Sequence, residues 1–330
     1  MTSASRRKRH GEVITIGLNP AIDRIVEVPD FTIGEHQSGA LVARQPAGKA
    51  LNVSLALDVL DRPSIATGFV GEQEIREFEN CLEACSINPQ FFPVRGRTRE
   101  NITIIDPQHR TQTHIRMPGF EIDAGDLVRL EQKIDRLFEP ECHVIVAGSL
   151  PLGMTAEQFA RFLVNCHAQS GHFCVDCSGE ALQHAANLPL WLIKPNLEEL
   201  APLLGLDDAT ILSLVDACGA ARRLVRPQGS LQNILLSGGS QGAALISEAG
   251  TWLAVCPLAE QDVRNTVGAG DCLLAGFIHA VRDGVEVPEA LRYAVATASA
   301  AIQQTRTVEL DPKVIGGLLE HTQIRHIDNV

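Results

Sequence analysis

The sequence lacks long apolar runs and an excess of positive charge. Its apolar stretches fall well short of the roughly 18 residues needed to cross a bilayer, so we expect no contact with a membrane. Lys and Arg number 28 against 40 Asp and Glu, which gives a net charge of -12. This balance argues against nucleic acid as a partner, and any anionic substrate must be held by local positive groups.

Cysteine is present, but without the spacing of a disulfide framework or a zinc site. Nine cysteines, odd in number and scattered, suit a reducing cytoplasm, where we therefore expect the protein. Cys174 and Cys177 form a Cys-x-x-Cys, but neither a second pair nor a following helix accompanies them. We interpret both as thiols of the core.

The chain also lacks internal repeats, and its basic start lacks the apolar stretch of a signal peptide. We expect residues 1–11 to be a disordered tail; a basic address signal or nucleic-acid patch at residues 6–9 is the alternative. A hydrophobic content of 45% is enough for a sizeable core. Strand-like and helix-like segments alternate, which predicts one α/β domain over residues 12–324 and a second tail over residues 325–330.

Residues 265–271, Asn-Thr-Val-Gly-Ala-Gly-Asp, combine a glycine turn with an acid. The apolar run that follows at residues 272–278 predicts a buried helix starting near Gly268. The N–H groups at such a start suit a phosphate or the charge that develops during phosphoryl transfer. An acid there weakens anion binding, so we interpret Asp271 either as a general base for an attacking hydroxyl or as a simple helix cap.

Two other segments place polar residues at predicted strand ends and helix starts. Asp23 follows the apolar strand at residues 13–17 and is well placed at the sheet edge to hold sugar hydroxyls; a turn Asp without a ligand is the alternative. Lys49, after Gly48, opens a helix whose start suits an anion. Neither glycine turn fits Gly-x-x-x-x-Gly-Lys-Ser/Thr, which excludes a P-loop kinase.

From about residue 13 to about residue 312, the motifs resemble those of the ribokinase-type (PfkB) carbohydrate kinases. The residues of these motifs are most similar to those of the branch that contains 1-phosphofructokinase and tagatose-6-phosphate kinase. The segments that carry the resemblance are residues 19–23 (NPAID), 48–53 (GKALNV), 96–101 (GRTREN), 148–153 (GSLPLG), 194–199 (KPNLEE) and 265–271 (NTVGAGD).

The resemblance implies a ribokinase-like α/β fold of three layers, α/β/α, with a mainly parallel central sheet. It implies a small β-sheet lid from strands within about residues 25–45 and 101–117. ATP and Mg²⁺ are the implied cofactors and a sugar phosphate is the implied substrate. A homodimer through the lid strands is compatible with it.

The resemblance also implies a role for individual residues. Asp271 corresponds to the catalytic base, and Gly268, Ala269 and Gly270 correspond to the anion hole. The implied sugar-phosphate ligands are Asp23, Gly48, Lys49, Asn52, Arg99 and Ser149. The implied ATP and Mg²⁺ ligands are Lys194, Asn196, Glu199, Ser237, Gly239 and Gly242, with Mg²⁺ near Asn196 and Glu199 through water. A capping box explains Asn196 and Glu199 equally well.

Three residues depart from the family pattern: Ala50 and Glu72 replace usual glycines, and Cys272 replaces a small residue. The expected reaction converts D-fructose 1-phosphate to fructose 1,6-bisphosphate, because Lys49 and Arg99 favour a phosphorylated sugar. The alternatives are tagatose-6-phosphate kinase or 6-phosphofructokinase activity, a kinase for an unphosphorylated sugar or nucleoside, and a non-catalytic sugar-phosphate sensor. The departures at Ala50 and Glu72 leave room for the sensor.

Overall fold

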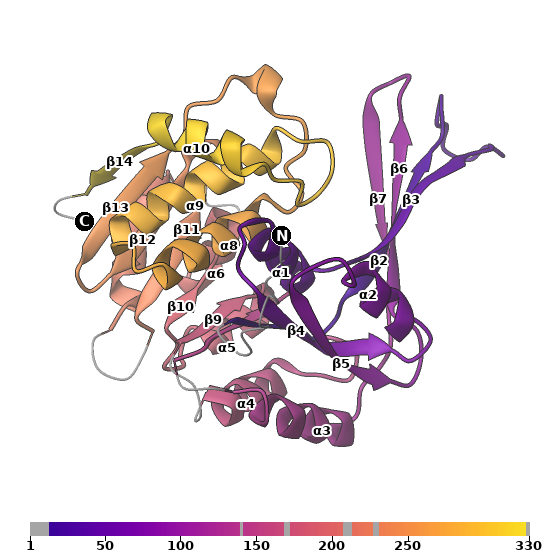
Figure 1. Ribbon diagram of the computed structural model, residues 1–330, viewed down its shortest axis with the longest axis horizontal. Coiled ribbons are helices and arrows are strands. Elements are labelled where there is room, and N and C mark those ends of the chain that lie inside the picture. Colours follow the sequence, from indigo (N-terminus) through magenta and orange to yellow (C-terminus); the bar gives the residue numbers. More distant parts are fainter. Residues whose placement is uncertain (1–12, 139–140, 168–171, 207–212, 227–230, 328–330) are drawn as a thin grey trace, which may run out of the picture.

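The computed structural model describes residues 13–138, 141–167, 172–206, 213–226 and 231–327, so the predicted tail at residues 1–11 lies outside it. Its centre is a ten-stranded sheet in the order β14-β13-β12-β11-β10-β9-β8-β1-β4-β5 (Figure 1). The pairs from β5 to β11 are parallel and those from β11 to β14 antiparallel, which confirms the mainly parallel sheet. The strands are β1 (Val13–Gly17), β4 (Ser64–Gly71), β5 (Ile87–Val94), β8 (His143–Ala147), β9 (His172–Asp176), β10 (Leu192–Ile193), β11 (Asn233–Ser237), β12 (Ala243–Ser247), β13 (Gly250–Val255) and β14 (Gln323–His326).

Helices cover both faces of this sheet, which confirms the three layers (Figure 1). One face carries α1 (Lys49–Val59), α8 (Ala269–Arg282) and α9 (Val287–Ile302), with α10 (Pro312–His321) packed on α9. The other carries α3 (Ala124–Asp135), α4 (Ala156–His167), α5 (Gly179–Ala185), α6 (Leu197–Leu203) and α7 (Leu214–Ala221). At the edge, α2 (Ile75–Cys81) packs beside β4 and β5. Short 3-10 helices are η1 (Arg222–Leu224), η2 (Gly239–Gln241) and η3 (Glu260–Asp262).

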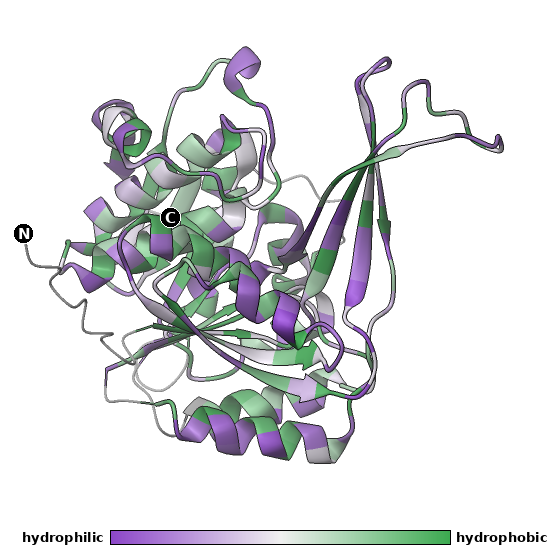
Figure 2. Cartoon of the chain, turned by 45° about the vertical axis from the view of Figure 1, so that its right-hand side comes forward, coloured by the Kyte–Doolittle hydropathy of each residue, from purple (hydrophilic) through white to green (hydrophobic). Residues whose placement is uncertain are grey.

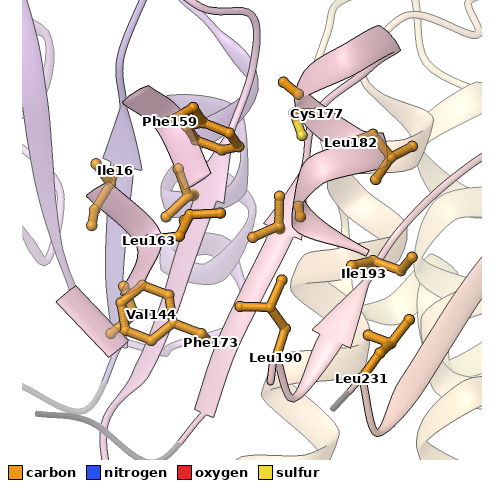
Figure 3. Close-up of a cluster of buried hydrophobic side chains, with 14 of the residues drawn as sticks. Ile16, Val144, Phe159, Leu163, Phe173, Cys177, Leu182, Leu190, Ile193 and Leu231 are labelled. Atoms are coloured by element: carbon orange, nitrogen blue, oxygen red, sulfur yellow. The ribbon is translucent and has the colours of Figure 1, made fainter. Parts of the chain in front are cut away.

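The central strands are buried on both faces, as parallel strands between helical layers must be. Along β8, Val144 and Val146 belong to one hydrophobic cluster and Ile145 to another, because successive side chains of a strand point to opposite faces. Figure 3 shows the first cluster, where Phe159 and Leu163 of α4 lie over the sheet. Within the described ranges, no helix is both long and apolar enough to span a bilayer.

A second sheet of four strands, in the order β3-β2-β6-β7, projects from the body (Figures 1 and 2). Its strands are β2 (Ala21–Glu27), β3 (Ala40–Ala47), β6 (Arg99–Asp106) and β7 (Thr111–Arg116). β2 and β6 pair in parallel, and the two outer pairs are antiparallel. The predicted separate small sheet is therefore confirmed.

Two predicted boundaries need correction. The small sheet begins earlier than residues 25 and 101, since β2 starts at Ala21 and β6 at Arg99. The domain does not end at residue 324, because β14 pairs with β13 as far as His326, whose ring packs edge-on against Trp252. A four-residue edge strand with one half-buried side chain, Ile324, gives too weak a pattern to predict.

The cysteines of the Cys-x-x-Cys lie in the core, as predicted. Cys174 and Cys177 are buried and free, in the middle of β9 and just after its end. Burial raises the pKa of both thiols above the usual range. Both thiols are therefore held in the protonated form.

Candidate active site

A cavity of about 490 Å³ lies where the central sheet meets the small sheet. Its inner wall consists of residues at the carboxyl ends of central strands and at the starts of α1 and α8, where parallel sheets place their ligands. β2, β6 and β7 supply its outer wall. The predicted site residues in its lining are Asp23, Gly48, Lys49, Asn52, Arg99, Ser149, Lys194, Asn196, Glu199, Ser237, Gly268, Gly270 and Asp271.

The glycine turn at residues 268–270 starts α8, as predicted. Gly268 is the N-cap residue and has a left-handed φ of 80°, and a Cβ at this position would lie 2.7 Å from Thr307 Cγ2. Ala269 and Asp271 donate their N–H groups to the carbonyls of Thr266 and Gly268. The turn itself therefore uses one donor of the predicted anion hole, the N–H group of Ala269.

Asp271 lies in the first turn of α8 and is almost fully buried, with 5% of its surface exposed. Asn52 of α1 donates a hydrogen bond of 2.7 Å from Nδ2 to Asp271 Oδ2. Burial, and then the negative charge of Asp176, raise the pKa of Asp271 to about 7, against the opposing effects of Asn52, Lys194 and Lys49. A carboxyl group with this pKa can take up a proton near neutral pH.

Asp176 organises the centre of the site, although the motif analysis gave it no role. This fully buried residue ends β9, and its carboxylate meets two lysines. Lys49 Nζ lies 2.8 Å from Oδ1 and Lys194 Nζ lies 3.0 Å from Oδ2. The sequence feature that could have identified Asp176 is its position as an acid at the carboxyl end of a buried strand.

The two lysines approach Asp176 from different elements. Lys49 begins α1, and Lys194 follows β10 and is buried. Burial disfavours the charge of Lys49, but Asp176 outweighs it and raises the pKa of Lys49 above its usual range. Gly270 allows Lys194 to approach α8, because a Cβ at Gly270 would lie 3.1 Å from Lys194 Nζ. Lys49 is thus bound to an internal carboxylate rather than directed to the small sheet.

The outer wall carries the predicted sugar-binding acid. Asp23 lies in β2, not in a loop after β1, and accepts a hydrogen bond of 2.8 Å from Asn101 Nδ2 of the neighbouring strand β6. Burial raises the pKa of Asp23, partly offset by the Asn101 bond and by Arg99 and Arg116. Asn101 and Arg116 were not predicted as site residues; the former belonged to a matched motif, and the latter carried no motif signal.

Ser149 lies at the cavity after β8, in the turn predicted for it. Asn19, which was also not predicted, donates from Nδ2 to Ser149 Oγ at 3.2 Å and to the Leu150 carbonyl at 2.9 Å. Its buried Oδ1 has no hydrogen-bond partner among the described residues. Asn19 therefore joins the β1 and β8 turns and keeps an acceptor near the cavity.

Asn196 and Glu199 form a complete capping box at the start of α6. Asn196 Oδ1 accepts from Glu199 N at 2.7 Å, and Glu199 Oε2 accepts from Asn196 N at 3.0 Å. Both residues also line the cavity, as does Ser237 at the end of β11. The capping function is thus present, and it does not remove these side chains from the site.

Gly239 and Gly242 lie in the turn between β11 and β12 and not in the cavity lining. Gly242 has a φ of 92°, and a Cβ there would lie 2.2 Å from the Ala254 carbonyl oxygen. The close approach of β13 therefore explains this glycine without a ligand.

Ala50 is accommodated by the fold. Ala50 is buried in the first turn of α1. A Cβ added at Gly17 would lie 3.4 Å from the Cβ of Ala50, which is an ordinary van der Waals distance. α1 still begins at Lys49. The replacement of the usual glycine leaves the helix start in place.

The departure at Glu72 lies in a turn stabilised by Glu74. Glu72 is exposed, whereas Glu74 is buried and accepts hydrogen bonds from Thr98 N at 2.9 Å and Arg97 Nε at 3.2 Å. Gly71 N donates to Thr98 Oγ1 at 3.0 Å. These bonds join the end of β4 to the start of β6, the strand that begins with Arg99.

Comparisons with known proteins agree with the geometry. The model of the family described as pfkB family carbohydrate kinase matches residues 11–313. A 1-phosphofructokinase of Bacillus subtilis is 31% identical over 87% of this chain and 91% of its own length, and one of Haemophilus influenzae is 30% identical over 96% and 99%. The solved structure of phosphofructokinase-2 from Escherichia coli in complex with potassium has a TM-score of 0.86 at 23% identity, covers 94% of this chain and 98% of its own, and shows the same fold.

Proposed function

The chain belongs to the pfkB family of carbohydrate kinases, and we propose that it phosphorylates D-fructose 1-phosphate to fructose 1,6-bisphosphate with ATP. The relatives named 1-phosphofructokinase support this sugar. The observation that carries the proposal is Asp271. A buried carboxyl group with a pKa of about 7, beside a helix start and two lysines, suits a general base of phosphoryl transfer.

In the proposed step, the 6-hydroxyl oxygen of the sugar forms a bond to the γ-phosphorus and the bond from that phosphorus to ADP breaks. Asp271 takes the hydroxyl proton. Lys49, Lys194 and the N–H groups of Gly268 and Gly270 offset the negative charge that develops on the transferred group. Asp176 holds both lysines in place through ion pairs and so keeps their ammonium groups at the inner end of the cavity.

Carbohydrate kinases of this family use ATP with Mg²⁺, and the residues present fit this pair. The described residues contain no group of three or more acids, histidines or cysteines that could enclose a metal. Mg²⁺ usually keeps several waters and is held by one or two carboxylates and the nucleotide phosphates. Glu199 and Asn196 would hold its waters at the cavity wall, and bound Mg²⁺ would neutralise phosphate charge. Lys194 and Ser237 would contact the phosphates; Gly239 and Gly242 would support the turn beside the nucleotide.

The sugar would lie between the two sheets. Asp23, oriented by Asn101, accepts bonds from sugar hydroxyls, and Asn52 and the Gly48 turn contact the sugar from α1. Ser149 and Arg99 also face this space. Positioning of this kind brings the reacting hydroxyl next to Asp271. It lowers the barrier because the translational and rotational entropy is lost when the substrate binds and not in the reaction step.

The test is an ADP-release assay with Mg²⁺ and ATP that compares kcat/KM for fructose 1-phosphate, fructose 6-phosphate, tagatose 6-phosphate and free fructose. We expect fructose 1-phosphate to give the highest value. Preference for either 6-phosphate would assign the protein to the neighbouring activities, and preference for free fructose to a kinase of unphosphorylated sugars. No turnover of any of the four would indicate the sugar-phosphate sensor.

We further propose that two copies pair through the small sheet. We also propose that the protein works in a reducing cytoplasm. Leu41 and Val42 on β3 and Ile115 on β7 are exposed apolar side chains on its strands. A tetrameric form is known for phosphofructokinase-2 of Escherichia coli. Light scattering of the native chain and of a Leu41→Ser, Val42→Ser variant tests this: we expect a dimer that the double substitution weakens, and a monomeric native chain would contradict it.

A further inference from the structure

Four cationic side chains line the cavity, and they fall into two pairs. Lys49 and Lys194 both meet the carboxylate of Asp176, so a negative group of the protein already faces their charges. Arg99 and Arg116 form no salt bridge with any described residue, although the carboxylate of Asp23 lies close enough to attract both. The unpaired cations of the cavity are therefore both arginines, and both belong to the small sheet.

The backbone places the two arginines on one face of that sheet. β6 and β7 are neighbouring strands (Figure 1). They run antiparallel, with Asn101 directly opposite Arg116. Arg99 is two residues before Asn101 and so points to the same side, toward Asp23. Arg99 and Arg116 are thus diagonal cross-strand neighbours, a relation in which side chains are typically about 7–8 Å apart.

The surroundings of Arg99 leave its terminal nitrogens available for a ligand. Its Nε donates to the Pro20 carbonyl at 3.3 Å, which directs the half-buried side chain into the cavity. Burial, and then the positive charge of Arg116, lower the pKa of Arg99, although Asp23 opposes this. Two guanidinium groups that repel each other in a cavity form a site for an anion that relieves the repulsion.

We propose that Arg116 and Arg99 together bind the phosphate that the sugar substrate already carries, a role that the motif pattern assigns to Lys49 and Arg99. Each guanidinium can donate two parallel hydrogen bonds to phosphate oxygens, and two of them match the dianionic charge of a phosphate monoester. Lys49, bound to Asp176, acts at the other end, on the transferred phosphoryl group. Arg116 is then a specificity residue that distinguishes phosphorylated from free ketohexose, an inference that rests on the proposed function.

The experiment compares Arg116→Gln with a matched control, Arg110→Gln. Arg110 is an arginine of the same hairpin, in the turn between β6 and β7, outside the cavity lining. We expect Arg116→Gln to raise KM for fructose 1-phosphate about ten-fold or more, the effect of losing a charge-assisted bond to a phosphate. kcat and the KM for ATP should stay within two-fold, and Arg110→Gln should match the native enzyme. Arg116→Lys should recover part of the loss, because it keeps the charge without the paired donors.

A second measurement separates phosphate binding from a structural effect. kcat/KM for free fructose, which has no phosphate, should be the same in Arg116→Gln and the native enzyme. An equal loss for both sugars, a loss in kcat alone, or an unchanged KM for fructose 1-phosphate would overturn the proposal.

If the native enzyme turns over no sugar, the proposed function fails, and calorimetric binding of fructose 1-phosphate still tests the arginine pair. Weaker binding by Arg116→Gln than by Arg110→Gln would support the pair in that case. Equal binding by the two variants would overturn it.

Discussion

The two ends of the cavity hold their charges in different ways. At the inner end, Asp176 is fully buried and binds Lys49 and Lys194, so charges of both signs are in contact before any ligand arrives. At the outer end, Arg99 and Arg116 lie on the small sheet without a salt bridge among the described residues, and the single carboxylate of Asp23 offsets their two charges only in part. The difference indicates that the groups at the reacting end are held in place before the substrate binds. The positive charge of the two arginines, in contrast, is left for the substrate to neutralise.

Removing the base should have the largest effect. Asp271→Asn keeps the shape and can still accept the bond from Asn52, but it cannot take a proton. We expect kcat to fall by about a thousand-fold or more, within the range for loss of a general base. ADP release gives kcat, calorimetry with fructose 1-phosphate should show nearly unchanged binding, and Asp262→Asn, at an exposed acid of η3, is the control. Turnover close to native would exclude Asp271 as the base.

Breaking the inner ion pairs should affect both stability and pH dependence. Asp176→Asn leaves Lys194 buried without its partner, which should lower the free energy of unfolding by about 3 kcal/mol in urea titrations at pH 7. Lys49 is 39% exposed and adds little to this cost, because water can solvate it.

The pH dependence of kcat/KM gives a second measure of the charge on Asp176, through its effect on Asp271. Asp271 must be ionised to act, so kcat/KM of the native enzyme should rise with pH and level off above its pKa of about 7. The charge of Asp176 helps to raise this pKa, so Asp176→Asn should move the midpoint to lower pH. Ionisation of the sugar phosphate is the same for both enzymes, so it cannot cause a difference between them. Coincident profiles would disprove the coupling.

A smaller effect is expected where the outer end is anchored to the body. Glu74→Gln removes the charge that accepts bonds from Thr98 N and Arg97 Nε, just before Arg99. We expect KM for the sugar phosphate to rise a few-fold with kcat nearly unchanged, and stability to fall by about 1 kcal/mol. Steady-state kinetics and urea unfolding measure both, with Glu72→Gln at the exposed neighbour as the control. A fall in kcat with KM unchanged would show that Glu74 does not act through Arg99.

Features that depend on neighbouring residues could be predicted well. The start of α8 at Gly268 and the capping box of Asn196 and Glu199 follow from spacings of three or four residues, which local backbone geometry determines. The motif order also indicated the family and thirteen residues of the cavity lining. Gly242 was harder to interpret, because a turn glycine looks the same whether a ligand or, as here, a neighbouring strand approaches it.

The sequence by itself determined the alternation of strands and helices, the small sheet, the glycine turn before Asp271 and the buried thiols, since each is encoded in a short pattern. Only the tertiary structure decided which charges meet. Lys49 and Asp176 are 127 residues apart, and their contact depends on the fold bringing the start of α1 to the end of β9. Arg116 faces the cavity because of its register opposite Asn101. Long-range pairing of this kind depends on strand order and register, which no short stretch of sequence contains.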